Sequence, residues 1–332
     1  MSVPENAATV ELAGQPAEVH VYAIDMRVPV RGLTVREGVI IERAGIWSEW
    51  SPDIELDDAA AARWLGESVT VSTPQLQRAS IPLSVTIPAL EAEQAAELAR
   101  ESSCVTATVV VADPAFDDDA DVRRVAAVRA ALGGHGKLRV DAAGQWSVER
   151  AVEMLSRLAE YDLQFVEQPV ATYDEMRQLR DELLTRGLEI EFAADELINA
   201  DPTNCDPAEI QQIAQYAVLK THALGGVNAT VDLAAQFDIP MVISSACETS
   251  IGLHAGIRAA ACLPTMRLSN ELDTIRLLTG DVVSKPLASQ YGAVRVAGRP
   301  RADKELLARY AADQDRTAWW LERLTRCAAL VG

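Results

Sequence analysis

The chain has 332 residues, of which 49% are hydrophobic and 24% are charged, and its formal net charge is −19. This length suits a single α/β barrel with additions, and the composition is that of a globular protein rather than a disordered one. The acidic balance argues against a nucleic-acid partner, which needs clustered Lys and Arg, and no apolar run is long enough to span a bilayer.

The N-terminal third differs in pattern from the rest of the chain. Residues 18–50 alternate apolar and polar positions and are rich in β-branched side chains, which predicts a small antiparallel sheet, and residues 57–67 have a helical pattern. We therefore predict an α+β capping domain over residues 1–80. No secretory signal is visible, and the five scattered cysteines form no CxxC pair, so we expect a cytoplasmic protein with reduced thiols.

From about residue 103 onward, short apolar runs alternate with segments of helical pattern, as expected for parallel βα units. Helix starts are marked by Asp117, by Ser147, by the T-x-x-E capping box of Thr172 and Glu175, and by Asp206 before a proline. The predicted fold class is α/β, a modified TIM (β/α) barrel over residues 81–285 behind the N-terminal α+β cap. The remaining segment, 286–332, includes an amphipathic helical pattern over 302–331 that we expect to pack on the cap or the barrel.

Four charged residues each close a short apolar run at nearly constant spacing. Asp141, Glu167, Asp195 and Lys220 are separated by 26, 28 and 25 residues, and Ser244 follows Lys220 by 24. The C-terminal ends of barrel strands meet at one mouth, so three carboxylates there could hold a divalent cation such as Mg²⁺ beside a lysine. One such Asp alone is usually a helix cap or a turn residue, but a periodic set of four predicts a metal site.

Five motifs carry a resemblance to a known family: VDAAGQWS (140–147), FVEQP (165–169), AADE (193–196), VLKTHALGGV (218–227) and ISSACETSIG (243–252). The chain resembles the enolase superfamily, and within it the actinobacterial o-succinylbenzoate synthases of menaquinone biosynthesis. The resemblance implies Mg²⁺ held by Asp141, Glu167 and Asp195, and a Lys220 that stabilises an enolate. It also implies substrate contacts near Ser244 and Ser245, and loss of water from a cyclohexadiene dicarboxylate.

The chain departs from that family where proton transfer is expected. The family has a K-x-K pair on the second barrel strand, whereas this chain has Thr108 and Val110, and its first lysine is Lys137. Valine cannot move a proton, and a threonine hydroxyl is too weak a base without a partner that activates it. Glu271 also stands where a glycine usually leaves room for substrate, and Ala143 stands in place of an asparagine.

Three hypotheses follow for the activity. The first is an o-succinylbenzoate synthase-like magnesium-dependent hydro-lyase. The second is a reaction on another carboxylate with Lys220 as the only base. His222 is a further candidate for a base, although a strand-end histidine is more often hydrogen-bonded locally. The third is a catalytically inactive barrel with a binding or regulatory role. The partner expected for an enzyme is a small carboxylate, with no nucleic acid and no membrane, and the sequence leaves monomer or homo-oligomer open.

Overall fold

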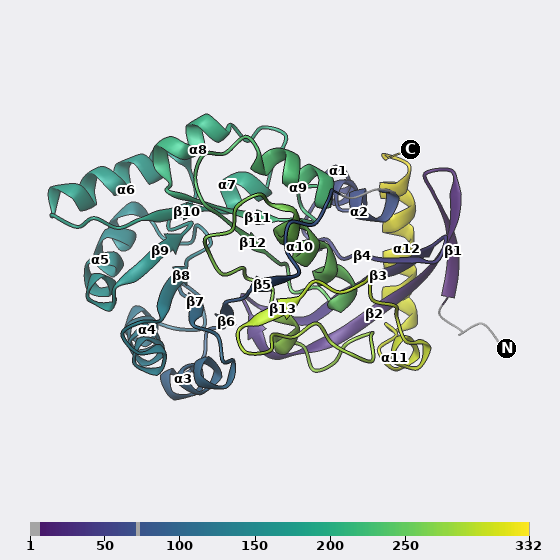
Figure 1. Ribbon diagram of the computed structural model, residues 1–332, viewed down its shortest axis with the longest axis horizontal. Coiled ribbons are helices and arrows are strands. Elements are labelled where there is room, and N and C mark those ends of the chain that lie inside the picture. The colour runs from purple at the N-terminus through teal and green to yellow at the C-terminus, as the bar shows by residue number, and fades with distance from the viewer. Residues whose placement is uncertain (1–6, 71–73, 332) are drawn as a thin grey trace.

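The computed structural model describes residues 7–70 and 74–331; residues 1–6 and 71–73 of the predicted cap, and residue 332, lie outside the described part. Two main sheets build the molecule, a four-stranded antiparallel sheet and a curled seven-stranded parallel sheet with helices on its outer face (Figure 1). The predicted fold class, an α/β barrel with an N-terminal cap, is confirmed. The predicted boundaries of the three segments stay a proposal.

The capping sheet is buried on both faces because its two long strands alternate apolar side chains. Tyr22 and Ile24 of β2 belong to the core shared with the barrel, whereas Val19 and Val21 belong to a second core formed with the C-terminal helix. Successive side chains of a strand point to opposite faces, so one strand serves both cores. The strands, in the order β1-β2-β3-β4, are β1 (Ala7–Leu12), β2 (Gln15–Val30), β3 (Leu33–Arg43) and β4 (Ile46–Trp50).

The barrel sheet has the order β12-β11-β10-β9-β8-β7-β6, and all its pairings are parallel. Isolated parallel bridges from Leu83 to Asn270 and from Ser244 to Glu271 join its two edges. Residues 270–271 therefore take the place of an eighth strand. The strands are β6 (Val85–Ile87), β7 (Thr106–Val110), β8 (Lys137–Asp141), β9 (Leu163–Glu167), β10 (Phe192–Ala194), β11 (Tyr216–Lys220) and β12 (Met241–Ser244).

The helix starts predicted from the sequence are confirmed. Asp117 and Ser147 accept hydrogen bonds from backbone N–H groups three residues ahead, Thr172 and Glu175 form the capping box, and Asp206 caps the helix that begins with a proline. The helices up to the end of the barrel are α1 (Asp58–Arg63), α2 (Gly66–Val69), α3 (Ala92–Glu101), α4 (Asp118–Leu132), α5 (Val148–Leu158), η1 (Ala159–Tyr161), α6 (Tyr173–Thr185), α7 (Glu196–Asn199), α8 (Pro207–Ile213), α9 (Val227–Ala234), α10 (Ser250–Cys262) and η2 (Thr274–Leu277).

The C-terminal stretch contains two helices where the sequence pattern predicts one. Ala311 forms an antiparallel bridge with Tyr22, and Asp313 caps a new helix by accepting a bond from the Arg316 N–H at 2.8 Å. The single-helix prediction was wrong because this strand-like contact and the new cap interrupt the pattern. The second helix packs on the capping sheet (Figure 1). These elements are α11 (Lys304–Arg309) and α12 (Gln314–Ala328), and a small ribbon pairs β5 (Ser80–Pro82) with β13 (Ala293–Arg295).

No helix within residues 7–70 and 74–331 is both long and apolar enough to cross a membrane.

Candidate functional site

The four charged residues of the periodic pattern lie at the same edge of the barrel. Asp141, Glu167 and Lys220 are the last residues of β8, β9 and β11, and Asp195 directly follows β10. Parallel strands bring their C-terminal ends together, so the sequence spacing becomes a cluster at the mouth. The residues two positions earlier form a layer beneath it, in which the Arg139 guanidinium lies 4.6 Å from the centre of the Phe165 ring. The layer also contains Ala193, Val218 and Val242.

Glu167 is a buried carboxylate of the cluster with an unpartnered oxygen. It is 2% exposed, and its Oε2 atom has no hydrogen-bond partner. Burial raises its pKa well above the usual range, and the charges of Glu271, Asp141 and Asp195 raise it further. A cation beside Glu167 would offset both the burial of its charge and the repulsion from the neighbouring carboxylates.

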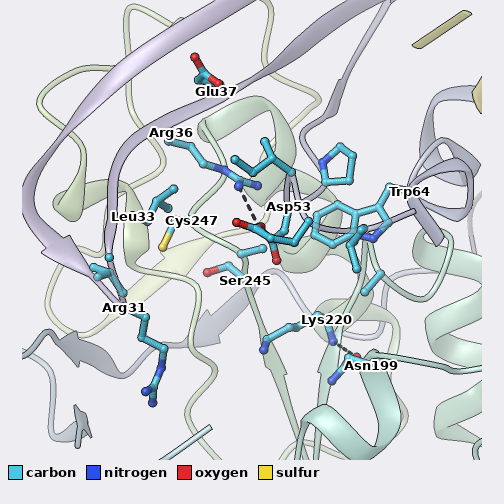
Figure 2. Close-up of a pocket in the computed structure, with 18 of the residues that line it drawn as sticks. Arg31, Leu33, Arg36, Glu37, Asp53, Trp64, Asn199, Lys220, Ser245 and Cys247 are labelled. Carbon is cyan, nitrogen blue, oxygen red and sulfur yellow. Dashed lines mark hydrogen bonds and ion pairs between the residues drawn. The ribbon is translucent and has the colours of Figure 1, made fainter. Parts of the chain in front are cut away.

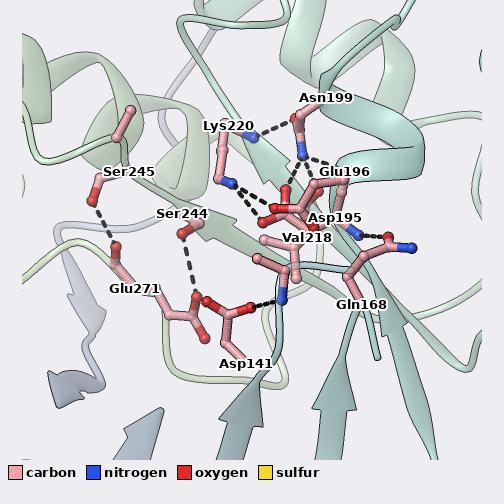
Figure 3. Close-up of polar contacts among 12 residues, drawn as sticks. Asp141, Gln168, Asp195, Glu196, Asn199, Val218, Lys220, Ser244, Ser245 and Glu271 are labelled. Carbon is pink, nitrogen blue, oxygen red and sulfur yellow. Dashed lines mark hydrogen bonds and ion pairs between the residues drawn. The ribbon is translucent and has the colours of Figure 1, made fainter. Parts of the chain in front are cut away.

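Asp195 and Lys220 form an ion pair across adjacent strands (Figure 3). The Lys220 Nζ lies 2.5 Å from Asp195 Oδ2 and 3.9 Å from Glu196 Oε1. Burial opposes the charged form of Lys220, but Asp195, Glu196 and Glu167 together raise its pKa well above the usual value. Asn199 fixes the pair by donating to Asp195 Oδ1 at 2.7 Å and accepting from the Lys220 N–H at 2.8 Å. This arrangement favours the ammonium form of Lys220.

Asp141 is paired with an arginine from the capping domain. Arg31, in the turn between β2 and β3, places Nη2 3.0 Å from Asp141 Oδ2 and 2.8 Å from the Asp141 carbonyl oxygen. Its Nη1 donates to the Val111 carbonyl at 3.4 Å, just past the end of β7. The cap therefore delivers a positive charge to the side of the mouth where the second barrel strand ends.

The three carboxylates are suitable ligands for Mg²⁺ but are not arranged around a ready site. Nowhere in residues 7–70 and 74–331 do three His, Cys, Asp or Glu side chains form a cluster that could hold a metal ion. Asp141 and Asp195 instead turn toward Arg31 and Lys220. The donor set still fits, because it is all oxygen and because one buried Glu167 oxygen lacks any partner.

A cavity of about 1040 Å³ lies between the cap and the barrel mouth. Its barrel wall is lined by Asp195, Lys220 and Ser245. Its cap wall is lined by Arg31 and Trp64. Figure 2 shows these side chains around the same space, with the ion pair of Arg36 and Asp53 on the cap side. The short segment after Trp50, residues 52–56, also lines the cavity. The site is therefore a pocket with cations on both walls.

On the second barrel strand, Thr108 and Val110 occupy successive inward positions. Strand register pairs Thr108 with Arg139 and Val110 with Asp141, so Thr108 lies one layer below the mouth. Both residues are buried, and the Thr108 hydroxyl donates to Glu271 Oε1 at 2.6 Å. Arg139 Nη1 approaches the same oxygen at 3.2 Å. A carboxylate is thus present beside the strand where the sequence lacks the expected lysines.

The remaining candidates from the sequence, two serines, a histidine and a cysteine, have different surroundings. The Ser244 hydroxyl donates to Glu271 Oε2 at 3.2 Å, whereas Ser245 bonds the Glu271 carbonyl at 3.1 Å and lines the cavity. The His222 Nε2–H donates to the Gly252 carbonyl at 3.0 Å and the ring stacks on Trp64, so this nitrogen is already engaged. Burial raises the pKa of the Cys247 thiol to about 11, which makes it a poor nucleophile.

Some residues of the site carry no sequence signal as strong as the spacing. Arg31 lies 110 residues before Asp141 in an ordinary turn, and only its charge marks it. Asn199 could be found from its position four residues after Asp195 on one helix. Gln168 follows Glu167 with a positive φ of 36° and accepts the Asp195 N–H at 3.1 Å, which ties two carboxylate-bearing strands together.

The fold and the site define a member of the enolase superfamily. The chain belongs to this superfamily: residues 91–300 match the family described as enolase C-terminal domain-like, and residues 21–71 match the enolase N-terminal domain-like family. Its sequence is similar to the o-succinylbenzoate synthase of Thermobifida fusca, with 39% identity over 313 residues that cover 93% of this chain and 95% of the relative. The enzyme of Mycolicibacterium smegmatis is also 39% identical, over 94% and 96% of the two chains.

Solved structures confirm the fold. The muconate lactonizing enzyme from Pseudomonas fluorescens superposes with a TM-score of 0.73 at 18% identity, covering 93% of this chain and all of that one. The N-succinyl Arg/Lys racemase from Bacillus cereus gives 0.71 at 16% identity, covering 90% and 97%. The chain is thus a homologue of o-succinylbenzoate synthases on the enolase fold.

Proposed function

We propose that this protein is a magnesium-dependent hydro-lyase of the o-succinylbenzoate synthase type, which forms an enolate next to a substrate carboxylate and then loses water. One observation carries the proposal: consecutive barrel strands bring Asp141, Glu167, Asp195 and Lys220 to one mouth beside a cavity of about 1040 Å³. The similarity to o-succinylbenzoate synthases over more than nine tenths of both chains supports the same substrate class.

The proposed metal ligands are Asp141, Glu167 and Asp195. Bound there, Mg²⁺ would supply positive charge that stabilises the enolate of a substrate carboxylate. A dipeptide epimerase from Cytophaga hutchinsonii, which shares this fold, has been solved in complex with Mg and a dipeptide. Asp141 is paired with Arg31 and Asp195 with Lys220, so a bound Mg²⁺ would share these carboxylates with the two cations.

The remaining groups act on the substrate directly. The Lys220 ammonium stabilises negative charge that develops on the substrate oxygen, because a cation already held in place costs little rearrangement during the reaction. Arg31 lies on the cap side of the cavity and is placed to pair with a carboxylate that enters. The cap also covers the mouth, which limits access of water.

Turnover of the cyclohexadiene dicarboxylate by the purified protein with Mg²⁺ tests the proposal. The aromatic product is followed by absorbance for the wild type, for Lys220→Ala, and for Lys285→Ala as a control at an exposed lysine. We expect turnover by the wild type and the control, and a loss of about 10²–10³ in kcat for Lys220→Ala. No turnover by the wild type would favour the binding or regulatory barrel, and full activity of Lys220→Ala would remove Lys220 from the mechanism.

A further inference from the structure

Glu271 is a rigidly held carboxylate at the point where the barrel closes. Its N–H donates to the Ile243 carbonyl at 2.9 Å, and its own carbonyl accepts the Ser245 hydroxyl at 3.1 Å. It is only 5% exposed and occupies the position of the eighth strand, next to β12. The backbone therefore fixes the direction of the side chain toward the inside of the barrel.

The Glu271 side chain reaches across to the second strand. Its Oε1 accepts the Thr108 hydroxyl at 2.6 Å and faces Arg139 Nη1 at 3.2 Å, whereas its Oε2 has one longer bond, from the Ser244 hydroxyl at 3.2 Å. One oxygen is thus anchored by two donors. The other oxygen faces a serine hydroxyl that can rotate away from it.

Glu271 and Lys220 stand at separate places around the mouth. Figure 3 shows Glu271 near Asp141 and Ser244, and Lys220 with Asp195 and Asn199 at the other end of the group. The Lys220 Nζ lies 2.5 Å from Asp195 Oδ2 and 3.9 Å from Glu196 Oε1, on the strands away from β7. A carboxylate is the group beside the second strand that can remove a proton, because neither a valine nor an unassisted threonine hydroxyl is a useful base.

We propose that Glu271 is the proton-transfer residue of this site, and that it replaces in function the lysines absent from positions 108 and 110. This inference rests on the proposed function. The Glu271 carboxylate takes the proton from the carbon next to the substrate carboxylate, and the C–H electron pair moves into the enolate. The protonated Glu271 then gives this proton to the hydroxyl group on the neighbouring carbon. The C–O bond breaks with its electron pair, water leaves, the enolate pair forms the new double bond, and Glu271 returns to its carboxylate form.

Glu271→Gln is the decisive variant because the amide keeps the size and an oxygen acceptor for Thr108 but cannot accept the proton. We expect kcat to fall by about 10²–10⁴ relative to the wild type, the usual contribution of a general acid–base group. Mg²⁺ binding, measured by calorimetry with the metal alone, should change by less than about threefold. Glu189→Gln, at an exposed position, is the matched control and should keep wild-type rates.

A second variant separates catalysis from structure. Glu271→Asp keeps the charge that faces Arg139 but withdraws the carboxylate by one methylene, so we expect a folded protein with a kcat at least about tenfold lower. If the wild type turns over the substrate and Glu271→Gln does so at the same rate, the assignment is overturned. Glu271 would then be only a counter-ion of Arg139. Absence of turnover by the wild type itself would refute the proposed function, and the role of Glu271 with it.

Discussion

Replacement of Glu167 by glutamine should stabilise the metal-free protein. The carboxylate is 2% exposed, one oxygen has no partner, and three other carboxylates raise its pKa. An unsatisfied buried polar group costs about 1–3 kcal/mol, and a charged one costs more. The glutamine amide removes the charge and can donate to Asp195, so we expect Glu167→Gln to gain about 2 kcal/mol at neutral pH without metal. For a chain of this length, with about 2.1 cal/mol/K per residue of unfolding entropy, that corresponds to a rise in Tm of about 3 °C.

The pH dependence gives an independent check. A carboxyl with a raised pKa in the folded state binds its proton more tightly there than in the unfolded chain, so stability falls as pH rises above the unfolded value of about 4.5 and through the folded pKa. The wild type in EDTA should show this loss, and Glu167→Gln should show less of it. Mg²⁺ should raise the Tm of the wild type and not that of the variant. A variant that is less stable than the wild type in EDTA at neutral pH would refute the reasoning.

Three further outcomes are expected. Arg31→Met removes a cation 3.0 Å from Asp141 and should tighten Mg²⁺ binding about tenfold in calorimetry; weaker binding would mean that Arg31 helps to form the site. Asp121→Ala leaves the fully buried Arg124 unpaired and should cost about 3–5 kcal/mol in urea unfolding, so a cost below 1 kcal/mol would contradict the burial seen here. Glu49→Ala deprives the N-terminus of α10 of the carboxylate that accepts three of its backbone and hydroxyl donors. It should destabilise the protein by about 2–4 kcal/mol in the same assay, and an unchanged midpoint would show that water replaces it.

The features that the sequence predicts well are local or periodic. The capping box of Thr172 depends on side chains three residues apart, and the alternation in β2 depends on burial of both faces. The clustering of Asp141, Glu167 and Lys220 at one edge follows from the constant repeat of parallel βα units. These signals can be recognised in a single sequence because each depends on a short stretch or on a regular interval.

Contacts between distant segments could not be predicted in this way. Arg31 reaches Asp141 because the cap folds over the barrel, and no spacing rule links two segments 110 residues apart. The strand that closes the barrel consists of only two bridged residues, 270 and 271, so no run of apolar residues predicts it. The sequence marks Glu271 only as an unusual residue, and its reach to Thr108 becomes visible with the closed barrel. The metal-ligand roles remain predictions.

The position of α12 has a consequence for the order in which the molecule can be assembled. Trp320 of α12 covers Trp50 on the outer face of the capping sheet, with the two ring centres 5.5 Å apart. In the chain, the whole barrel lies between these two residues. A ribosome synthesises the barrel before it releases α12, so the cap should gain its full stability last, and the cavity between cap and barrel with it. In a nascent chain stalled after residue 300, we expect the barrel segments to resist proteolysis while residues 15–50 remain cleavable. Equal protection of both would show that the capping sheet forms without its helix.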